Sequence, residues 1–495
     1  MSALLAVSPV LVPLLTAAAC VALARRPRLQ AGMSLAGAIA WLACALLLVR
    51  AVGGGEVLVT RFGDWPAPFA IEFRIDPAGA LLIAASALLA VLALAVPARG
   101  GGTGMHSPLR HPLVHGLLAG VGGAYATGDL FNLYVWYEVM LISALGLIVL
   151  GGRAQHLEAG FKYLTLNLFG TILVLLAIAG LYGLTGQLNL AALVQALGER
   201  GDDPLARALL ALLMVSLLIK AGGLPFFFWL PAAYPVLPPA MLALFSALAT
   251  KVGVFALLRV SAGLPAELAE TFLPWLGWLA VAGMIVGVLG AAYHYDTRRI
   301  LAFHSVSQIG YMLLAVALGG TMGLAAALFF ILHHMLVKSS LFLLGGMMAR
   351  SGAGFDLRRS GGLLAARPML AVLFALSAAS LVGIPPLSGF WAKLLVVRES
   401  FALGQFAWGA AALAVGGLTL YSMVKIWIEA FWKPAPETTN EVAPGPPRAL
   451  PAGAWLASAT LAGLTLAVGL APQPLIDYLQ LAAGAMLAPG AELPR

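Results

Sequence analysis

Long apolar runs, separated by short polar or basic joints, recur from one end of this chain to the other. A run of about 18 apolar residues is long enough to cross a bilayer as a helix. We therefore predict an all-α polytopic membrane protein with about fourteen membrane-spanning helices. The expected spans cover residues 3–24, 30–50, 73–97, 111–128, 130–151, 160–182, 205–230, 239–260, 272–293, 299–319, 322–347, 367–400, 405–432 and 451–472.

The joints between these spans carry residues typical of turns. The clearest are "RRPR" (25–28), "RGGGTGMHSP" (99–108), "DTRR" (296–299), "RSGAGFDLRRSGG" (350–362) and "KPAPETTNEVAPGPP" (433–447). A shorter amphipathic segment, 185–197, is expected to lie along the membrane interface between spans six and seven. The first apolar run is too long for a signal-peptide core and lacks a basic start, so it is interpreted as a retained helix.

Composition agrees with this pattern. Of the 495 residues, 61% are hydrophobic and only 10% are charged, which is too little charge to cover a soluble protein of this size. In a soluble chain a net charge of +8 would favour a nucleic-acid partner, but here the arginines fall at helix ends. Cys20 and Cys44 lie inside apolar runs and indicate neither a disulfide framework nor a metal site. The expected environment is the lipid bilayer, with no nucleic acid.

The basic residues also predict an orientation, because cytoplasmic loops carry an excess of Lys and Arg. Alternate loops differ clearly in this respect, so the richer set is expected to face the cytoplasm and both termini to lie outside. The richer set holds Arg25, Arg26, Arg28, Arg99, Arg110, Arg153, Arg298, Arg299, Arg350, Arg358, Arg359 and Lys433. The poorer set holds Arg61, Arg200, Arg259 and Arg398, alongside acids such as Glu56, Asp64, Glu267 and Glu270.

Two long spans are interrupted in a related way. The seventh reads "KAGGLPFFFWLP" and is broken by Gly222, Gly223 and Pro225. The twelfth reads "LVGIPPLSGFWAKLL" and is broken by Gly383, Pro385, Pro386 and Gly389. Such a pair favours inverted repeats around a site in the middle of the membrane. The alternative is two ordinary proline kinks, which membrane helices tolerate.

The lysines carry the functional prediction. Only seven of the 28 basic residues are lysines, yet five of them fall inside apolar spans, whereas no arginine lies in mid-span. Burying an ionisable group at the bilayer centre costs roughly 2.5–3.5 kcal/mol or more. Lysine differs from arginine in having a pKa that its surroundings can shift towards neutrality. Proton transfer is therefore the simplest reason for Lys220, Lys251, Lys338, Lys393 and Lys425.

Glu138, in "FNLYVWYEVMLISALG", is the acidic counterpart of these lysines, alone in the middle of its span. A nearby carboxylate favours the protonated state of an ammonium, and separating the two favours proton release. Glu138 and Lys220 are therefore a candidate switch pair. The alternative is a static buried pair that fixes helix packing.

Other polar groups could connect the two broken spans. Lys251 lies in span eight, and His334 and Lys338 are four residues apart on one helical face. His333 points elsewhere on that helix and is ranked lower, as a packing or hydrogen-bonding residue. His304 stands with Ser305, Ser307 and Gln308, which could hold water, although a histidine can also simply bond a backbone carbonyl.

Lys425 is a secondary candidate. It lies four residues before Glu429 near the cytoplasmic end of its span, where a snorkelling ion pair is the favoured interpretation. The sequence contains no phosphate-binding loop, no Cys/His cluster with metal or haem spacing, and no nucleophile paired with a base. We expect no metal, no cofactor and no enzyme activity.

These residues resemble a known family. The chain is similar to the proton-translocating antiporter-like family shared by Mrp-type cation/proton antiporters, respiratory complex I and membrane-bound hydrogenases, and within it to the Mrp D-type subunits. The resemblance covers nearly the whole chain and rests on "YVWYEVMLISALG", "KAGGLPFFFWLP", "ALATKVGVFALLR", "DTRRILAFHSVSQIGYM", "HHMLVKSSLFLLGG", "DLRRSGG", "GIPPLSGFWAKLL" and "LTLYSMVKIW". Phe227 and Tyr234 stand where complex I relatives usually have histidines, and His304 where they often have tyrosine.

The resemblance implies fourteen helices with two inverted five-helix repeats. The first repeat would cover 111–260 (helices four to eight) and the second 261–433 (helices nine to thirteen). A three-helix segment, 1–110, would precede them, and helix fourteen with a tail, 434–495, would follow. It also implies that Glu138 and Lys220 form the switch of the first half-channel, that Lys251, His334 and Lys338 continue the relay, and that Lys393 ends it.

The expected function is a proton-translocating subunit of a multisubunit Na⁺/H⁺ antiporter in a bacterial cytoplasmic membrane. Its partners would be a homologous large A-type subunit and small membrane subunits. One alternative is an antiporter-like subunit of a redox-driven complex of the complex I or hydrogenase type. Another is a scaffold whose buried charges only organise packing. No span carries the oxygen-rich acidic cluster that a hard cation prefers, so the Na⁺ path is expected to need partner subunits.

Overall fold

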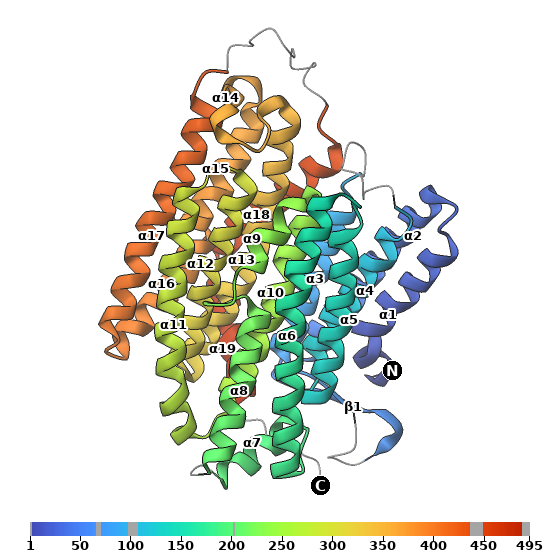
Figure 1. Cartoon of the computed structure of the whole chain (residues 1–495), viewed down its shortest axis with the longest axis vertical. Coiled ribbons are helices and arrows are strands. Elements are labelled where there is room, and N and C mark those ends of the chain that lie inside the picture. The colour runs from blue at the N-terminus through green and yellow to red at the C-terminus, as the bar shows by residue number, and fades with distance from the viewer. Residues whose placement is uncertain (1, 66–70, 98–106, 201–202, 436–448, 488–495) are drawn as a thin grey trace.

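Nearly all of the described chain is helical. A computed structural model describes residues 2–65, 71–97, 107–200, 203–435 and 449–487. The long helices run side by side along the long axis of the molecule (Figure 1). Within the described residues, twelve helices are long and apolar enough to cross a membrane, and Pro368–Val382 is a shorter apolar helix. The predicted all-α polytopic fold is confirmed.

Each expected span corresponds to one helix or to a broken pair. The first three are α1 (Ser2–Ala22), α2 (Pro27–Ala51) and α3 (Pro77–Leu94). The next five are α4 (Arg110–Ala126), α5 (Leu130–Val149), α6 (Ala154–Thr185), α8 (Pro204–Ala221) with the short α9 (Trp229–Ala233), and α10 (Pro239–Ala262). The remainder are α11 (Ala266–Tyr293), α12 (Thr297–Leu318), α13 (Gly320–Met348), α15 (Pro368–Val382) with α16 (Ser388–Ala402), α17 (Phe406–Trp427) and α18 (Ala452–Leu470).

Shorter elements join the spans. The segment expected around 185–197 contains helix α7 (Leu190–Gly198), whose first turn is capped by Asn189. Helix α14 (Leu363–Ala366) precedes α15. Single turns of 3₁₀ helix cover Phe62–Asp64, Tyr234–Val236 and Leu357–Arg359, and π-helical turns cover Ala349–Ala353 and Ile428–Trp432. The expected joints at 99–108 and 433–447 fall mainly on residues 98–106 and 436–448, which lie outside the described part of the chain.

Two elements were not expected. Strands β1 (Leu58–Arg61) and β2 (Glu72–Ile75) form an antiparallel pair before α3. Helix α3 therefore begins later than the predicted residue 73, because Asp76 caps it by accepting from Gly79 N at 2.7 Å. Helix α19 (Gln473–Leu487) follows α18 where only a tail was expected. It packs against α13 and α3, and Tyr478 Oη donates to Pro77 O at 3.1 Å.

Helices α10, α12 and α13 form the interior. They are buried along almost their whole length, whereas α1, α2, α6 and α17 keep open faces. These three interior helices carry most of the predicted relay residues: Lys251, His304, His333, His334 and Lys338. Their polar side chains therefore face other helices rather than lipid, as ionisable groups inside a membrane protein do.

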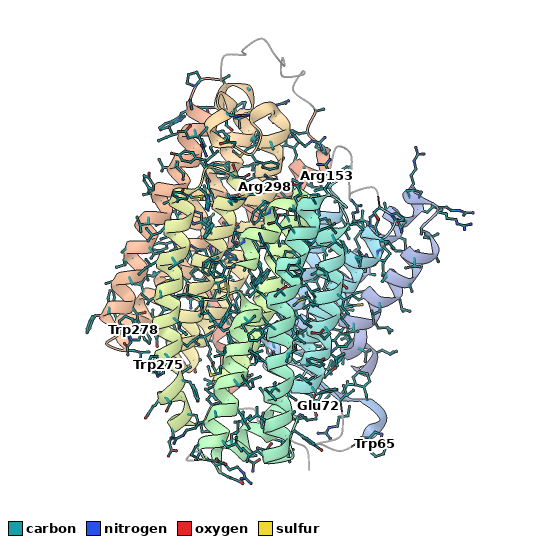
Figure 2. The ribbon with its side chains drawn as sticks, viewed as in Figure 1. Trp65, Glu72, Arg153, Trp275, Trp278 and Arg298 are labelled. Carbon is teal, nitrogen blue, oxygen red and sulfur yellow. The ribbon has the colours of Figure 1, made fainter. Side chains whose placement is uncertain are left out.

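Labelled elements and residues distinguish the two ends of the helical bundle. Helix α14 lies at the upper end of Figure 1, and α7 and β1 lie at the lower end. Figure 2 shows Arg153 and Arg298, both from the arginine-rich set of loops, near the upper end, and Glu72 and Trp65 near the lower end. We refer to the upper end as the arginine-rich end.

Candidate proton-transfer site

The first predicted helix break is confirmed. Helix α8 ends at Ala221, and Gly222 follows in the left-handed conformation with φ of 71°, where glycine is strongly favoured. Gly222 N donates to Ile219 O at 3.1 Å and Gly223 N to Leu218 O at 3.0 Å, which closes the last turn. A Cβ at Gly222 would lie 2.6 Å from Leu230 Cδ1, so a side chain here would also require Leu230 to shift. Lys220 lies in the last turn before this break.

The second predicted break is confirmed as well. Helix α15 ends at Val382, and Gly383 follows with φ of 98°. Helix α16 resumes at Ser388 and carries Lys393. Although Lys393 follows its break in the sequence, its Nζ donates back to Val382 O at 2.7 Å. The lysine side chain therefore returns to the end of α15 and satisfies one of the carbonyls that the break exposes.

Glu138 and Lys220 are joined through a third side chain. Thr171 of α6 donates its hydroxyl hydrogen to Glu138 Oε1 at 2.7 Å. The same hydroxyl accepts a hydrogen bond from Lys220 Nζ, which also donates to Asn167 O at 3.0 Å. Thr171, Asn167 and Lys220 are all buried. Sequence reasoning brought the acid and the lysine together but missed the threonine that lies between them.

Tyr137 connects the first lysine with the second. Its ring centroid lies 5.6 Å from Lys220 Nζ, and its hydroxyl donates to Val252 O at 3.4 Å, next to Lys251. Helices α8 and α10 approach closely here, because a Cβ at Gly253 would lie 2.6 Å from Ala221 Cα. Tyr137 is thus a buried aromatic group in contact with one lysine and adjacent to the next.

The candidate proton-transfer residues from Glu138 through Lys220, Lys251 and Lys338 to Lys393 form a row. The middle of this row lies between α10, α12 and α13. Lys251 Nζ donates to Ser246 O at 2.6 Å and to Thr250 Oγ1 at 3.0 Å. Lys338 Nζ donates to Leu301 O of α12 at 2.6 Å. His334, one turn before Lys338 on α13, is completely buried, and neither ring nitrogen has a hydrogen-bond partner. Both lysines are near enough to act electrostatically on His334.

One face of α12 leads from the middle lysines to Lys393. His304, Gln308 and Tyr311 are spaced four and three residues apart and share this face. His304 Nε2 lies 3.0 Å from Ser422 Oγ of α17, and both polar atoms of the buried Gln308 amide lack a partner. The Tyr311 ring lies 5.1 Å from Lys393 Nζ. Sequence reasoning noted His304 and Gln308 and missed Tyr311.

His333 belongs to the second break. Its Nδ1 lies 2.8 Å from Ser388 Oγ, the first residue of α16. A Cβ at Gly389 would lie 2.8 Å from His333 Cε1, so glycine leaves room for the imidazole beside the helix start. This contact joins α13 to α16 and agrees with the hydrogen-bonding role favoured for His333.

Lys425 caps a helix rather than forming the expected pair with Glu429. Its Nζ donates to Ala292 O and His294 O, both at 2.6 Å, and to Ala291 O at 3.3 Å. These carbonyls lie at the end of α11 or just beyond it, where a helix has no internal donors left and a cation is favoured. Glu429 pairs instead with Lys433 at 3.2 Å.

Exposure differs along the row. Lys220, Lys251 and Lys338 are buried, whereas Glu138 at one end and Lys393 at the other are only partly buried. The row therefore runs through the interior and reaches the sides of the molecule at both ends. Among the described residues, no cluster of three or more His, Cys, Asp or Glu side chains is placed to hold a metal ion.

Two helix starts share a capping arrangement. Asp129 caps α5 and forms an isolated antiparallel β-bridge with Asn189. Asp296 caps α12 and forms the same kind of bridge with Asp356. In each case an aspartate begins a spanning helix and its backbone pairs with a segment about 60 residues later.

These two starts lie at opposite ends of the bundle. Gly128, next to Asp129, donates from its backbone to Glu72 O at 3.0 Å, and Glu72 lies at the lower end in Figure 2. Arg298, in the first turn of α12, lies at the upper end. Helices α5 and α12 therefore start from opposite ends.

Asp129, at the lower end, has a carboxyl group whose pKa is shifted by its surroundings. Burial raises the pKa of its carboxyl to about 6, and the negative charge of Glu72 acts in the same direction. A backbone hydrogen bond from Asn132 N, at 2.7 Å, opposes this shift because it stabilises the carboxylate.

Comparison with known proteins agrees with this geometry. Residues 127–419 match the family model described as "NADH:quinone oxidoreductase/Mrp antiporter, TM". The chain belongs to this family. The expected resemblance is thus confirmed over more than half of the chain.

Relatives match almost the full length. The chain is 35% identical to the D-type subunit of the Na(+)/H(+) antiporter of Alkalihalophilus pseudofirmus, over 96% of this chain and 95% of that one. It is 33% identical to the corresponding D-type subunit of the Na(+)/H(+) antiporter of Bacillus subtilis, over 97% of each chain. A chain in the structure of the Mrp complex from Dietzia sp. DQ12-45-1b matches with a TM-score of 0.90 and 35% identity, over 99% of this chain and 98% of that one.

Proposed function

We propose that this chain is the proton-translocating subunit of a multisubunit Na⁺/H⁺ antiporter of the Mrp type, a transporter subunit rather than an enzyme. Full-length relatives named as D-type subunits of Na⁺/H⁺ antiporters support the proposal. The observation that carries it is the Glu138–Thr171–Lys220 chain, in which a hydroxyl bonded to a carboxylate also accepts from a buried ammonium. This arrangement suits a group that must hold and release a proton.

In this mechanism Glu138 biases the first half-channel. Its carboxylate stabilises a charged Lys220 through the hydroxyl between them, and breaking that contact weakens the stabilisation. Lys220 then passes its proton inward to Lys251, with Tyr137 beside both. Arginine could not replace lysine in this task, because arginine does not deprotonate in proteins.

The second half continues the transfer from Lys251 to Lys393. His334 and Gln308 support this step, because each is buried and carries two polar atoms without a protein partner. Buried polar atoms of this kind are usually satisfied by ordered water. Water hydrogen-bonded between them would connect Lys251 and Lys338 with the α12 face that leads to Lys393. His304, hydrogen-bonded to Ser422, is a further proton-transfer residue on that face.

We further propose two inverted repeats, 111–260 and 261–433, each containing one half-channel, between a three-helix segment, 1–110, and a final segment, 434–495. The two breaks support this, since each has a left-handed glycine directly after the helix. The two aspartate-capped helices, α5 and α12, start from opposite ends, as inversion requires.

The partners proposed are a homologous large A-type subunit and small membrane subunits. The partly exposed Glu138 and Lys393 support this, because a proton path that reaches the sides of the chain can continue into neighbouring subunits. The Na⁺ path would involve these subunits. We place the complex in a bacterial cytoplasmic membrane with the arginine-rich end inside and both termini outside.

The second candidate is an antiporter-like subunit of a redox-driven complex, since the matching family includes NADH:quinone oxidoreductase proteins. Mass spectrometry of the gently solubilised complex separates the two. Co-purifying small membrane subunits support the antiporter, whereas flavin or iron–sulfur proteins would contradict it.

The direct test uses Lys220→Ala in membrane vesicles that contain the assembled complex. We expect Na⁺-dependent proton exchange to be lost while assembly is retained. The matched control is Lys433→Ala, which removes an exposed lysine paired only with Glu429. If the Lys220 variant assembles and exchange persists, the proton-relay proposal is wrong and the buried charges only organise packing.

A further inference from the structure

A cavity of about 290 Å³ opens at the arginine-rich end and takes no part in the relay described above. Arg110, Arg153, His156 and Arg298 line it, and the segment from Pro235 to Pro239 forms one wall. Figure 2 shows Arg153 and Arg298 at this end of the bundle. No aspartate or glutamate is among the described residues that line the cavity.

Four helices begin at this cavity. Helix α4 starts at Arg110, α6 directly after Arg153, α10 at Pro239, and α12 one residue before Arg298, and all four of these residues line the cavity. The start of each helix carries a partial positive charge, although the first N–H groups of α12 already donate to Phe355 O and to the Asp296 side chain. The end of α5, near Leu150, contributes the opposite sign, but it is one helix end against four.

The side chains add to this positive field. Arg298 donates from Nε and Nη2 to the two oxygens of Asp296, at 3.2 and 2.8 Å, and from Nη1 to Pro235 O at 2.7 Å, so its charge is balanced and it holds the wall in place. Arg153 is exposed at the cavity rim. His156 is only 8% exposed, and its Nδ1 has no hydrogen-bond partner. A buried polar atom without a partner, in a cavity with an unbalanced positive field, is an indication of a ligand.

We propose that this cavity binds a phosphate-bearing anion, either the headgroup of an anionic phospholipid or free phosphate. The guanidinium fork of Arg153 matches phosphate oxygens in pairs, and the starts of α4, α6 and α10 add a positive field at the same place. The volume holds a phosphate with a short glycerol stem. Arg153 and His156 would hold the bound anion at the start of α6, against the wall formed by Pro235 to Pro239. The proposal does not depend on the transport function.

The test measures thermal unfolding of the purified complex in detergent during titration with three probes. These are short-chain phosphatidylglycerol, short-chain phosphatidylcholine and inorganic phosphate. Arg153→Gln removes the exposed arginine at the rim. Arg28→Gln is the matched control, because Arg28 is exposed, belongs to the same arginine-rich set and does not line the cavity.

We expect phosphatidylglycerol to raise the unfolding temperature at concentrations where phosphatidylcholine does not. Arg153→Gln should raise the half-effect concentration by about tenfold, as expected for one lost charge-assisted contact, while Arg28→Gln leaves it unchanged. Arg153→Lys should give an intermediate shift, and it serves as the comparison if the glutamine variant does not assemble.

The probes also separate the two sources. If inorganic phosphate alone reproduces the stabilisation, and Arg153→Gln abolishes it, the site takes free phosphate. If no anionic probe stabilises the complex, or if the Arg153 and Arg28 variants respond alike, the proposal is overturned. A lack of stabilisation by every anionic probe is also the result expected if an acidic side chain of a partner subunit fills the cavity.

Discussion

The hydroxyl of Thr171 donates to the Glu138 carboxylate at 2.7 Å and accepts from Lys220 Nζ, so acid and lysine are joined through a side chain of α6. Glu138 and Lys220 were expected as a switch pair, with no group named between them. With a hydroxyl between them, a rotation about one side-chain bond of Thr171 is enough to disconnect Glu138 from Lys220. Neither spanning helix needs to shift for this contact to break.

Thr171→Val tests this junction. Valine keeps the branched shape and removes the hydroxyl, so Glu138 and Lys220 lose their common partner. We expect the rate of Na⁺-dependent proton exchange in vesicles to fall about tenfold, equivalent to roughly 1.4 kcal/mol. The measurement is the initial rate of proton movement on adding Na⁺, normalised to the amount of assembled complex.

The control for this change is Thr165→Val on the same helix. Thr165 is exposed, and its hydroxyl only donates to Phe161 O at 2.9 Å, one turn earlier. Both variants lose one threonine hydroxyl from α6, but only one touches the relay. Equal rates in the Thr171 variant and the wild type would show that the hydroxyl bridge is not used.

The sequence identified the lysines and the breaks, because a charge or a Gly/Pro cluster inside an apolar run is visible in one dimension. Thr171, Tyr137 and Tyr311 were missed for the opposite reason. Threonine and tyrosine are common in spanning helices, and nothing local distinguishes Thr171 from Thr165. Their importance comes from which helices pack together, and the helix order around Lys220 is a property of the tertiary structure.

Lys393→Arg tests whether the last lysine must release a proton. Arginine keeps the positive charge near Val382 O, where Lys393 is only partly buried. Because arginine does not deprotonate in proteins, exchange should fall at least about tenfold while assembly is retained. Exchange rates in vesicles and the yield of intact complex are measured together.

Lys393→Met is the companion variant, because it removes both the charge and the proton. If the arginine variant works and the methionine variant does not, Lys393 is a structural cation at the end of α15. If both are inactive and both assemble, the requirement is for a titratable group.

Lys425→Met separates a lysine that caps a helix from one that carries protons. Lys425 donates to three carbonyls at or just beyond the end of α11. Their loss should lower the free energy of unfolding by about 2 kcal/mol, the range for hydrogen bonds to a charged group. Exchange per assembled complex should stay near the wild-type level. Thermal unfolding and vesicle exchange are the two measurements. A loss of exchange without a loss of stability would show that Lys425 takes part in proton transfer.

Helix α19 and the β1–β2 pair mark another limit of the sequence pattern. The apolar run of α19 is interrupted by Gln473, Asp477 and Gln480, so the sequence does not predict a membrane-spanning helix there. It is helical because one side packs on α13 and α3. The β1–β2 pair joins two stretches that are too short and too polar to stand out alone. Both elements depend on partners that are distant in the sequence.

Asp129→Asn tests the electrostatics at the start of α5. The pKa of Asp129 is raised to about 6 in the folded protein, above the usual value for aspartate. The folded state therefore binds more protons than the unfolded state between about pH 4 and 6. Over that window the contribution of Asp129 to stability decreases as the pH rises, and above it the contribution stays at its lowest level.

Asparagine keeps the cap, because its side-chain oxygen can accept from Asn132 N as Asp129 does now. It removes the buried charge near Glu72, so the variant should unfold at a higher temperature than the wild type at pH 7. The difference should shrink as the pH falls from 6 towards 4, where the wild-type carboxyl becomes protonated. Unfolding temperatures across this range provide the measurement. A constant difference, or a variant that is less stable at pH 7, would show that Asp129 is stabilised as a carboxylate and that Glu72 does not oppose its charge.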